Sequence, residues 1–123
     1  MDRTFLLIGA LSGFFAVALG AFAAHGLRTR LPPDMLTVFE TGVRYHMYHT
    51  LALLAVATAI GRLGDARLLV VAGWLFTAGI VVFSGSLYLL AMTGTSALGA
   101  ITPIGGVLLL VGWASLALFA AAL

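Results

Sequence analysis

Long apolar runs separated by short polar stretches make up most of the chain. The charge-free run from Thr4 to Ala24 is long enough, at about 1.5 Å per helical residue, to cross a hydrocarbon core of roughly 30 Å. A second apolar run ends at Ile60, and no charged residue occurs from Leu68 to Leu123, which leaves room for two more spans. The pattern predicts helices over about residues 4–24, 34–60, 68–92 and 98–121.

Short segments rich in glycine, proline or charge separate these predicted helices. Pro32 and Pro33 in "LRTRLPPD" suit the first turn of a helix and not its interior. The segments "GRLGDAR" and "MTGTSALG" supply the other two turns. Lipid offers no hydrogen-bond partners to exposed backbone, so each span should be helical. We expect an all-α, integral membrane four-helix up-and-down bundle that forms a single domain over residues 1–123.

Composition narrows the class of protein. Hydrophobic residues make up 63% of the chain, and its mean hydropathy is +1.18, whereas soluble domains are nearer 45–50% apolar. The net charge of +2 comes with no basic stripe, which excludes nucleic acid as a partner. Membrane lipids are the expected partners, together with further copies of the chain or another membrane protein. Cysteine is absent, so there is neither a disulfide framework nor a thiolate metal site.

The first helix and the arginines bear on topology. The segment "AFAAHG" resembles a signal-peptide cleavage site, but the apolar run before it is too long for such a peptide, so we expect a retained helix. Arg3, Arg62 and Arg67 fall on one side of the predicted bundle, while Arg28 and Arg30 fall on the other. The balance favours a multi-pass protein with both termini in the cytoplasm.

Charged residues make up only 8% of the chain, yet several polar and charged side chains occur together in "FETGVRYHMYHT", residues 39–50. Glu40 and Arg44 are four residues apart with the acid first, the favourable order for a helical ion pair. Because successive helices alternate in direction, this segment should lie beside the polar ends of the other three helices. The other half of the bundle should be apolar, and Trp74 and Trp113 are expected there. The candidate cluster comprises His25, Glu40, Arg44, Tyr45, His49, Ser84, Ser86, Tyr88 and Thr102.

Small residues recur at spacings that favour close helix packing. In lipid, helices associate through such close approach and through interhelical hydrogen bonds. Packing within one bundle is the simpler interpretation, and binding of a second copy is the alternative. The predicted packing positions are Gly9, Gly13, Gly20, Gly105 and Gly106.

The histidines raise the question of a metal or haem. His46 and His49 are three residues apart on one helix, and His25 ends the preceding helix on the same side. Three imidazoles can hold zinc or copper, and two can ligate haem. Their depths differ, however, and we expect no metal and no cofactor. Nothing in the chain resembles a nucleophile with an oriented base, so we do not expect an enzyme.

Four segments carry a resemblance to a known family. They are "GAFAAHGL" (20–27), "TGVRYHMYHTLALL" (41–54), "FSGSLYLLAMTG" (83–94) and "ITPIGG" (101–106). Together they resemble the small four-helix membrane proteins grouped as domain of unknown function 423, which includes transmembrane protein 256-like proteins. The resemblance implies an integral protein of the bacterial inner membrane and implies no chemistry. His25 and His49 fit the family pattern, whereas His46 is particular to this sequence.

Three functions follow from these observations. The leading one is a structural or interaction protein of the membrane, with small-residue faces and no soluble domain. The first alternative is a small transporter or proton-linked channel that uses Glu40, Arg44 and His49. The hydroxyls on the third and fourth predicted helices are expected to form interhelical hydrogen bonds, and a polar pocket that faces His49 is the alternative; these residues are Ser84, Ser86, Tyr88 and Thr102. The second alternative is a metal or haem site built on the histidines.

Overall fold

The computed structural model describes residues 1–123, and its regular elements are all helices. Helix α1 (Asp2–Phe22) continues into a π-helical turn, Ala23–Leu27, and helix α2 spans Pro33–Leu63. Helix α3 (Arg67–Gly79) joins α4 (Gly85–Thr93) through a second π-helical turn, Ile80–Ser84. A 3₁₀ turn, Ser96–Ala100, leads into α5 (Thr102–Ala121). The prediction of an all-α chain is confirmed.

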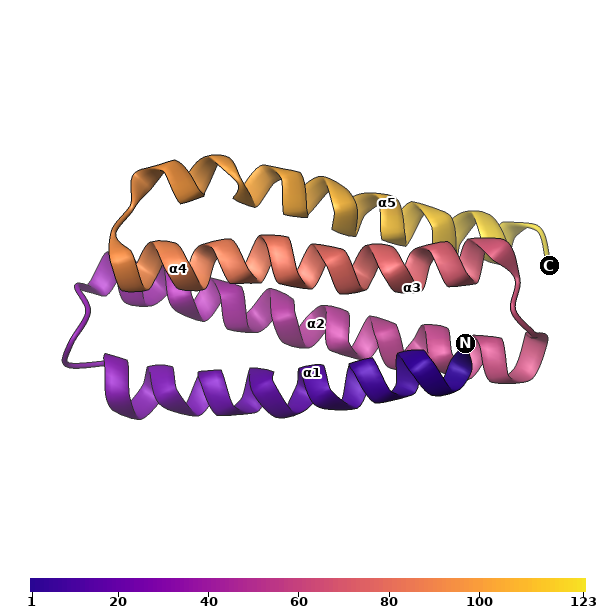
Figure 1. Cartoon of the computed structure of the whole chain (residues 1–123), viewed down its shortest axis with the longest axis horizontal. Coiled ribbons are helices and arrows are strands. Elements are labelled where there is room, and N and C mark those ends of the chain that lie inside the picture. The colour runs from indigo at the N-terminus through magenta and orange to yellow at the C-terminus, as the bar shows by residue number, and fades with distance from the viewer.

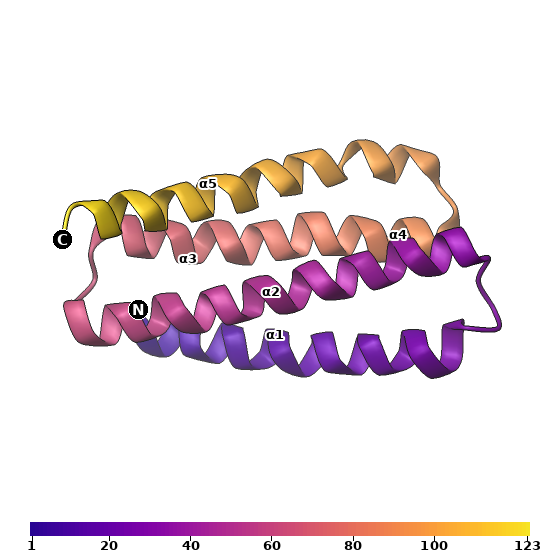
Figure 2. The ribbon, with the colours of Figure 1, turned by 180° about the vertical axis from the view of Figure 1, so that it is seen from behind.

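The helices form four long rods that lie side by side (Figure 1). The turns at residues 28–32 and 94–95 lie at one end of the molecule, and both termini lie with the turn at 64–66 at the other end. The view from behind gives the same arrangement (Figure 2). The polar segment that begins α2 therefore lies at the same end as the last turns of α1 and α4.

Two of the three turns depend on glycine. Gly64 has φ 87° and Gly94 has φ 68°, a region that other residues enter only with strain. Each residue follows the last turn of a helix, α2 or α4, and lets the chain leave the helical path. Pro33 opens α2, where its missing N–H group costs nothing.

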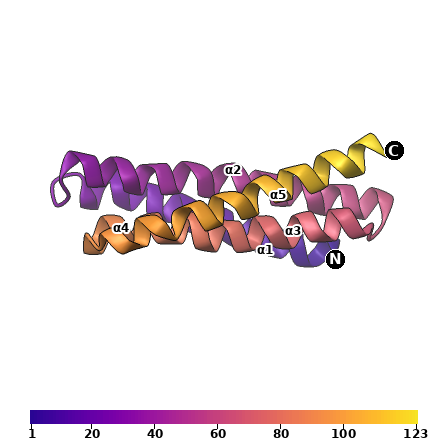
Figure 3. The ribbon, with the colours of Figure 1, turned by 90° about the horizontal axis from the view of Figure 1, so that it is seen from above.

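Helix α2 is central and the outer rods are kept apart. Helix α1 packs on α2, α2 packs on the α3–α4 rod, and α5 packs on α3 and the second π-helical turn. Seen from above, α1 lies behind and α5 lies in front, on opposite sides of the molecule (Figure 3). Helix α2 and the α3–α4 rod each contribute ten buried residues, whereas α1 and α5 contribute few. The rod with the most polar side chains is therefore one of the two that are best shielded from lipid.

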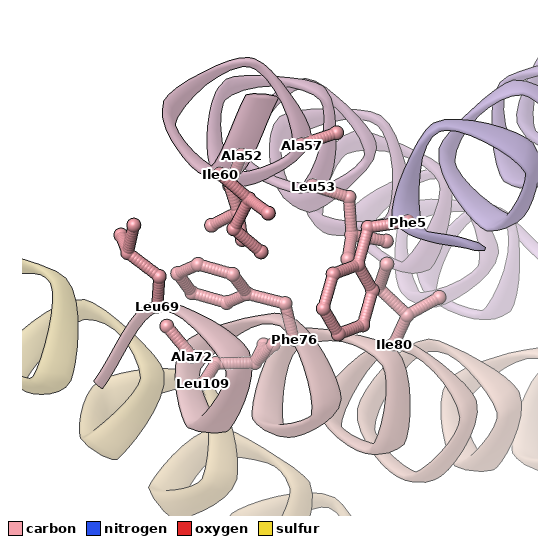
Figure 4. Packing of buried hydrophobic residues seen from close by; sticks show 11 residues of the cluster. Phe5, Ala52, Leu53, Ala57, Ile60, Leu69, Ala72, Phe76, Ile80 and Leu109 are labelled. Atoms are coloured by element: carbon pink, nitrogen blue, oxygen red, sulfur yellow. The ribbon is translucent and has the colours of Figure 1, made fainter. Parts of the chain in front are cut away.

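An apolar cluster fills the half of the molecule nearest the 64–66 turn (Figure 4). Phe5, Leu53, Val56, Leu69 and Phe76 have no exposed surface. We call this region the dry half; its members are Phe5, Ala52, Leu53, Val56, Ala57, Ile60, Leu69, Ala72, Phe76, Ile80 and Leu109. A smaller cluster of Ala23, Leu27, Phe39 and Ala91 closes the other end.

The glycine row of α1 faces α2. A Cβ atom added to Gly9 would lie 2.8 Å from Leu54, and one added to Gly13 or Gly20 would lie 3.3 Å from a side chain of α2. On α5, Gly105 lies directly against the backbone of Phe83. Gly106 makes no such approach, since its added Cβ would be an ordinary 3.8 Å from the Phe83 ring.

Three segments are long and apolar enough to cross a membrane, namely Asp2–Leu27, Arg67–Thr93 and Ser96–Ala121. Helix α2, the fourth predicted span, is longer than any of these but does not meet the same measure. The physical reason lies in its own sequence, which places charged and imidazole side chains along its first half.

Candidate functional site: hydrogen-bonded clusters around helix α2

His46 is at the centre of the first polar cluster. Its Nδ1 lies 2.8 Å from the hydroxyl of Tyr88, and the side chain of His46 is buried. Thr50 donates its hydroxyl hydrogen to the His46 carbonyl at 2.9 Å, so in the 2.6 Å contact between Ser12 and Thr50 the serine is the donor. We call Ser12, His46, Thr50 and Tyr88 the His46 cluster. It joins α1, α2 and α4.

Ser84 makes a second link between α2 and the α3–α4 rod. Its hydroxyl donates to the Gly42 carbonyl at 2.7 Å, and the serine is almost fully buried. The rods can approach this closely because position 42 lacks a side chain: an added Cβ atom would lie 2.8 Å from the Tyr88 ring. Ser84 is the last residue of the second π-helical turn, an irregularity of the kind often found where a helix must place one side chain.

Ser86 and Thr102 form a separate pair between α4 and α5. The two hydroxyls are 2.6 Å apart. Ser86 donates to the Phe83 carbonyl at 2.8 Å, so Thr102 donates to Ser86. This pair ties the start of α5 to the end of the α3–α4 rod.

His49 lies on another side of α2 and contacts α5. Trp113 donates its indole N–H to Nε2 of His49 at 3.0 Å, and Nδ1 of His49 lies 2.7 Å from the Tyr45 carbonyl. Tryptophan only donates and a carbonyl only accepts, so His49 must be the neutral tautomer with its hydrogen on Nδ1. Both ring nitrogens are then occupied. The ring of Phe76 packs 5.7 Å from the imidazole, which brings His49 to the edge of the dry half.

Three lateral grooves flank these contacts. One, of about 420 Å³, lies between α1 and the α3–α4 rod and reaches His46 and Tyr88. Another, of about 510 Å³, lies between α2 and α5 and reaches His49 and Trp113. The third, of about 460 Å³, lies between the ends of α1 and α2 and carries the charged side chains of Arg28, Glu40 and Arg44. The first two are lined mostly by apolar and aromatic groups.

The amino-acid sequence matches a family described as "Protein of unknown function (DUF423)" over residues 19–106. The chain belongs to the DUF423 family. Similar proteins include UPF0382 membrane protein YwdK of Bacillus subtilis, which is 50% identical over 111 residues, 90% of each chain. A UPF0382 membrane protein of Haemophilus influenzae is 50% identical over 117 residues, 95% of this chain and 93% of that one.

A third relative, UPF0382 membrane protein SSP2132 of Staphylococcus saprophyticus, is 50% identical over 111 residues, 90% of this chain and 91% of its own. No solved structure matches the chain at a significant level. This DUF423 chain is a membrane protein of an uncharacterised family, which confirms the family resemblance seen in the sequence motifs. The names of the relatives state no activity.

The ion pair predicted between Glu40 and Arg44 does not form in the DUF423 protein. Arg44 instead donates to the Thr41 hydroxyl at 3.2 Å, and both Glu40 and Arg44 are exposed. The only ion pairs join the ammonium group of Met1 to Asp2 at 3.9 Å and to Asp65 at 3.4 Å. An exposed helical pair gains little free energy, so a nearby hydroxyl competes with the carboxylate for the guanidinium.

His25 does not join the other histidines. The first π-helical turn packs on α2 through Ala23 and Leu27, which are buried, and His25 lies between them on the exposed face. Nor does any part of the molecule gather three or more His, Cys, Asp or Glu side chains in a group that could hold a metal ion. The structure thus separates the three imidazoles that the sequence placed on one side of the membrane.

Trp113 packs on Phe76 of the dry half, the apolar half in which the sequence placed it. It also donates to His49, a contact that the sequence did not predict. Helices α2 and α5 have few contacts with each other, so the long indole side chain makes this link between them. The polar pocket predicted to face His49 also differs, since Ser84 bonds to Gly42 and Tyr88 bonds to His46.

Sequence reasoning omitted four side chains that form these interhelical contacts: Ser12, His46, Thr50 and Trp113. A signal existed for two of them. Thr50 follows His46 by one helical turn, the spacing that lets a hydroxyl reach the preceding carbonyl. Ser12 is a hydroxyl within the GxxxG segment of the first helix, beside the glycines that bring α1 close to α2. Ser12 and Trp113 also lie outside the stretch that matches the DUF423 family.

Proposed function

We propose that this protein is a multi-pass, four-helix up-and-down protein of the bacterial inner membrane with a structural or interaction role, and that it is not an enzyme. The observation that carries the proposal is that every buried side-chain nitrogen and oxygen has a hydrogen-bond partner within the chain. A site built for a ligand normally leaves groups free to receive it. Here the buried polar groups serve one another and hold the helices together.

The polar contacts connect all four rods. Ser12 joins α1 to α2, Ser84 and Tyr88 join α2 to the α3–α4 rod, and Trp113 joins α5 to α2. Each interhelical hydrogen bond in a membrane protein contributes about 0.6 kcal/mol on average. Leaving such groups unpaired in hydrocarbon costs several kcal/mol each, so the bonds also fix which faces of the helices meet.

Membrane placement is supported by the three long apolar segments and by the names of the relatives. Charged residues cluster at the two ends of the rods, near the turns at 28–32 and 64–66. Arg3, Arg62 and Arg67 outnumber Arg28 and Arg30, since Arg44 lies too far inside α2 to count as a loop charge. Both termini are therefore proposed to face the cytoplasm.

The contacts argue against a transporter or a proton-linked channel. Such a function would need Glu40, Arg44 and His49 to act together. Glu40 and Arg44 instead line the groove beside α1, while His49 faces α5. The dry half begins next to His49 and consists of apolar side chains, which cannot transfer a proton. The hydroxyls nearby are those of Thr58, Thr77 and Ser115, and each donates to a carbonyl of its own helix.

Flux measurements test this proposal. Purified protein reconstituted in liposomes should show no proton or potassium flux above that of protein-free liposomes. Flux that requires the protein and disappears in Glu40→Gln or His49→Gln would overturn the structural role and favour transport. The proposed partners are lipids and either a second copy or another membrane protein, received by the exposed apolar faces of α1 and α5.

A further inference from the structure

A charged groove lies where the end of α1 meets the first half of α2. Its walls are the small residues Gly20 and Ala24 on one rod and the charged Glu40 and Arg44 on the other, with Arg28 from the adjoining turn. The volume of the groove is about 460 Å³, and it opens sideways from the bundle. None of the hydrogen-bonded clusters described above extends into it.

The two arginines of the groove have no anionic partner. Neither Arg28 nor Arg44 takes part in an ion pair, and Arg44 uses one of its five N–H donors on Thr41. Counting Glu40, the groove carries a net charge of +1. An unpaired charge close to hydrocarbon is unfavourable in free energy, so an anion bound between these guanidinium groups would stabilise them.

The depth of the groove indicates the source of that anion. Helix α2 has 31 residues, which corresponds to about 46 Å, longer than the roughly 30 Å hydrocarbon core. With α2 centred in the bilayer, Arg44 lies about one to two helical turns inside the boundary, and its long side chain reaches back to the level of the head groups. Lipid phosphates lie at that level, and the small residues on α1 leave room beside them for the first carbons of an acyl chain.

We propose that this groove binds a phospholipid with a single net negative charge, whose phosphate accepts hydrogen bonds from Arg28 and Arg44. The phosphate charge then offsets the net charge of +1, and Gly20 and Ala24 contact the adjoining acyl chain. Planar guanidinium groups suit phosphate oxygens because they donate two parallel hydrogen bonds. The inference rests on the membrane placement proposed above, but it does not depend on the absence of transport.

Lipid titration of the purified protein tests the inference. Binding of phosphatidylglycerol, phosphatidylcholine and phosphatidylethanolamine is measured by native mass spectrometry in a non-ionic detergent, with the melting temperature as a second readout. Phosphatidylglycerol should bind more tightly than the two zwitterionic lipids. Arg28→Gln and Arg44→Gln should each weaken its binding about fivefold, the effect expected of one arginine near an anionic lipid.

Two arginines outside the groove provide matched controls. Arg30→Gln and Arg62→Gln make the same change of charge and should leave binding within about twofold of the original. Glu40→Gln should strengthen phosphatidylglycerol binding because it removes a negative charge from the groove. Ala24→Leu, which fills the groove from an exposed position, should weaken binding without a large change in melting temperature.

Several outcomes would overturn the inference. Equal binding of phosphatidylglycerol and phosphatidylcholine would show that the groove does not select an anionic lipid. Equal losses in the groove and control variants would show that the arginines act only through net charge. Tighter binding of phosphatidylethanolamine, lost in Glu40→Gln, would assign the groove to a zwitterionic lipid. Inorganic phosphate that displaces phosphatidylglycerol at millimolar concentration would point to a free anion. The membrane topology and the absence of ion flux proposed above would stand in each case.

Discussion

Trp113 of α5 donates its indole N–H to Nε2 of His49 on α2 across 3.0 Å, and this bond joins two rods that share few other contacts. This bond fixes the tautomer of the His49 imidazole, and it lies at the boundary between the polar half of the molecule and the dry half. The stability of the bundle should therefore be sensitive to this one pair.

Trp113→Phe should lower the free energy of unfolding by about 1–3 kcal/mol, because Nε2 of His49 loses its donor. Unfolding in mixed detergent micelles, followed by circular dichroism, measures the change. Trp74→Phe is the matched control: Trp74 is 48% exposed and contacts Phe5 without a hydrogen bond, so the change should stay within about 0.5 kcal/mol. Equal effects of the two substitutions would contradict the role given to the bond.

Gly42→Ala should destabilise the protein by about 1–3 kcal/mol, because the new methyl group would lie 2.8 Å from the Tyr88 ring and force α2 away from α4. Gly85→Ala provides the control. No atom lies within 4 Å of the position its Cβ would take, and alanine is the better helix former by about 0.5–1 kcal/mol. The two substitutions should thus change the melting temperature in opposite directions.

Glu40 and Arg44 should behave independently of each other. The sequence alone predicts an ion pair, with Glu40→Gln costing more than Ser86→Ala and the double substitution with Arg44→Gln recovering part of the loss. Since both residues are exposed and the structure contains no such pair, the coupling between Glu40→Gln and Arg44→Gln in the free energy of unfolding should be no more than the roughly 0.3–0.5 kcal/mol of an exposed helical pair. His49→Ala with Trp113→Phe should instead be clearly non-additive. Recovery in the Glu40 and Arg44 double variant would restore the ion-pair interpretation.

Cysteine labelling tests the path of the chain. The protein has no cysteine of its own, so single cysteines at Thr29, Asp65 and Thr95 report one position each. Positions 29 and 95 should react from the periplasmic side, and position 65 from the cytoplasmic side. Asp65 is preferred to Gly64, whose φ of 87° would strain a cysteine. Labelling of positions 29 and 95 from opposite sides would rule out the proposed four-span topology.

Metal analysis and absorption spectroscopy address the histidines. Protein purified without a metal-affinity tag should carry no stoichiometric haem, zinc or copper, because both nitrogens of His49 are engaged and His25 lies on an exposed face. A metal bound at one atom per chain, lost in His49→Ala and retained in His25→Ala, would disprove this.

The positions of the helices follow from the sequence because length and hydropathy act locally. Pro33, Gly64 and Gly94 mark the ends of the rods through their own backbone preferences, which need no knowledge of the rest of the fold. The rotation of each helix about its axis is a different matter. It depends on which faces pack, and every side of α1 or α5 is apolar enough to face either lipid or protein.

Trp113 and His25 illustrate that limit. Nothing near Trp113 in the chain distinguishes it from Trp74, yet one donates to a buried imidazole and the other lies against Phe5. The outward position of His25 depends on the first π-helical turn, where one extra residue per turn shifts the faces of the helix. The link from Ser84 to Gly42 depends on the second π-helical turn in the same way.

The packing of α1 on α2 and of α3 on α5 divides the molecule into two hairpins, with the turn at 64–66 between them. During synthesis the first hairpin can enter the bilayer and pair Ser12 with Thr50 before the second has left the ribosome. The hydrogen-bond partners of His46 and His49 are Tyr88 and Trp113, and both belong to the second hairpin. The order of the residues along the chain therefore allows the first hairpin to form by itself, and the bundle is complete only when the second hairpin supplies the partners of both histidines.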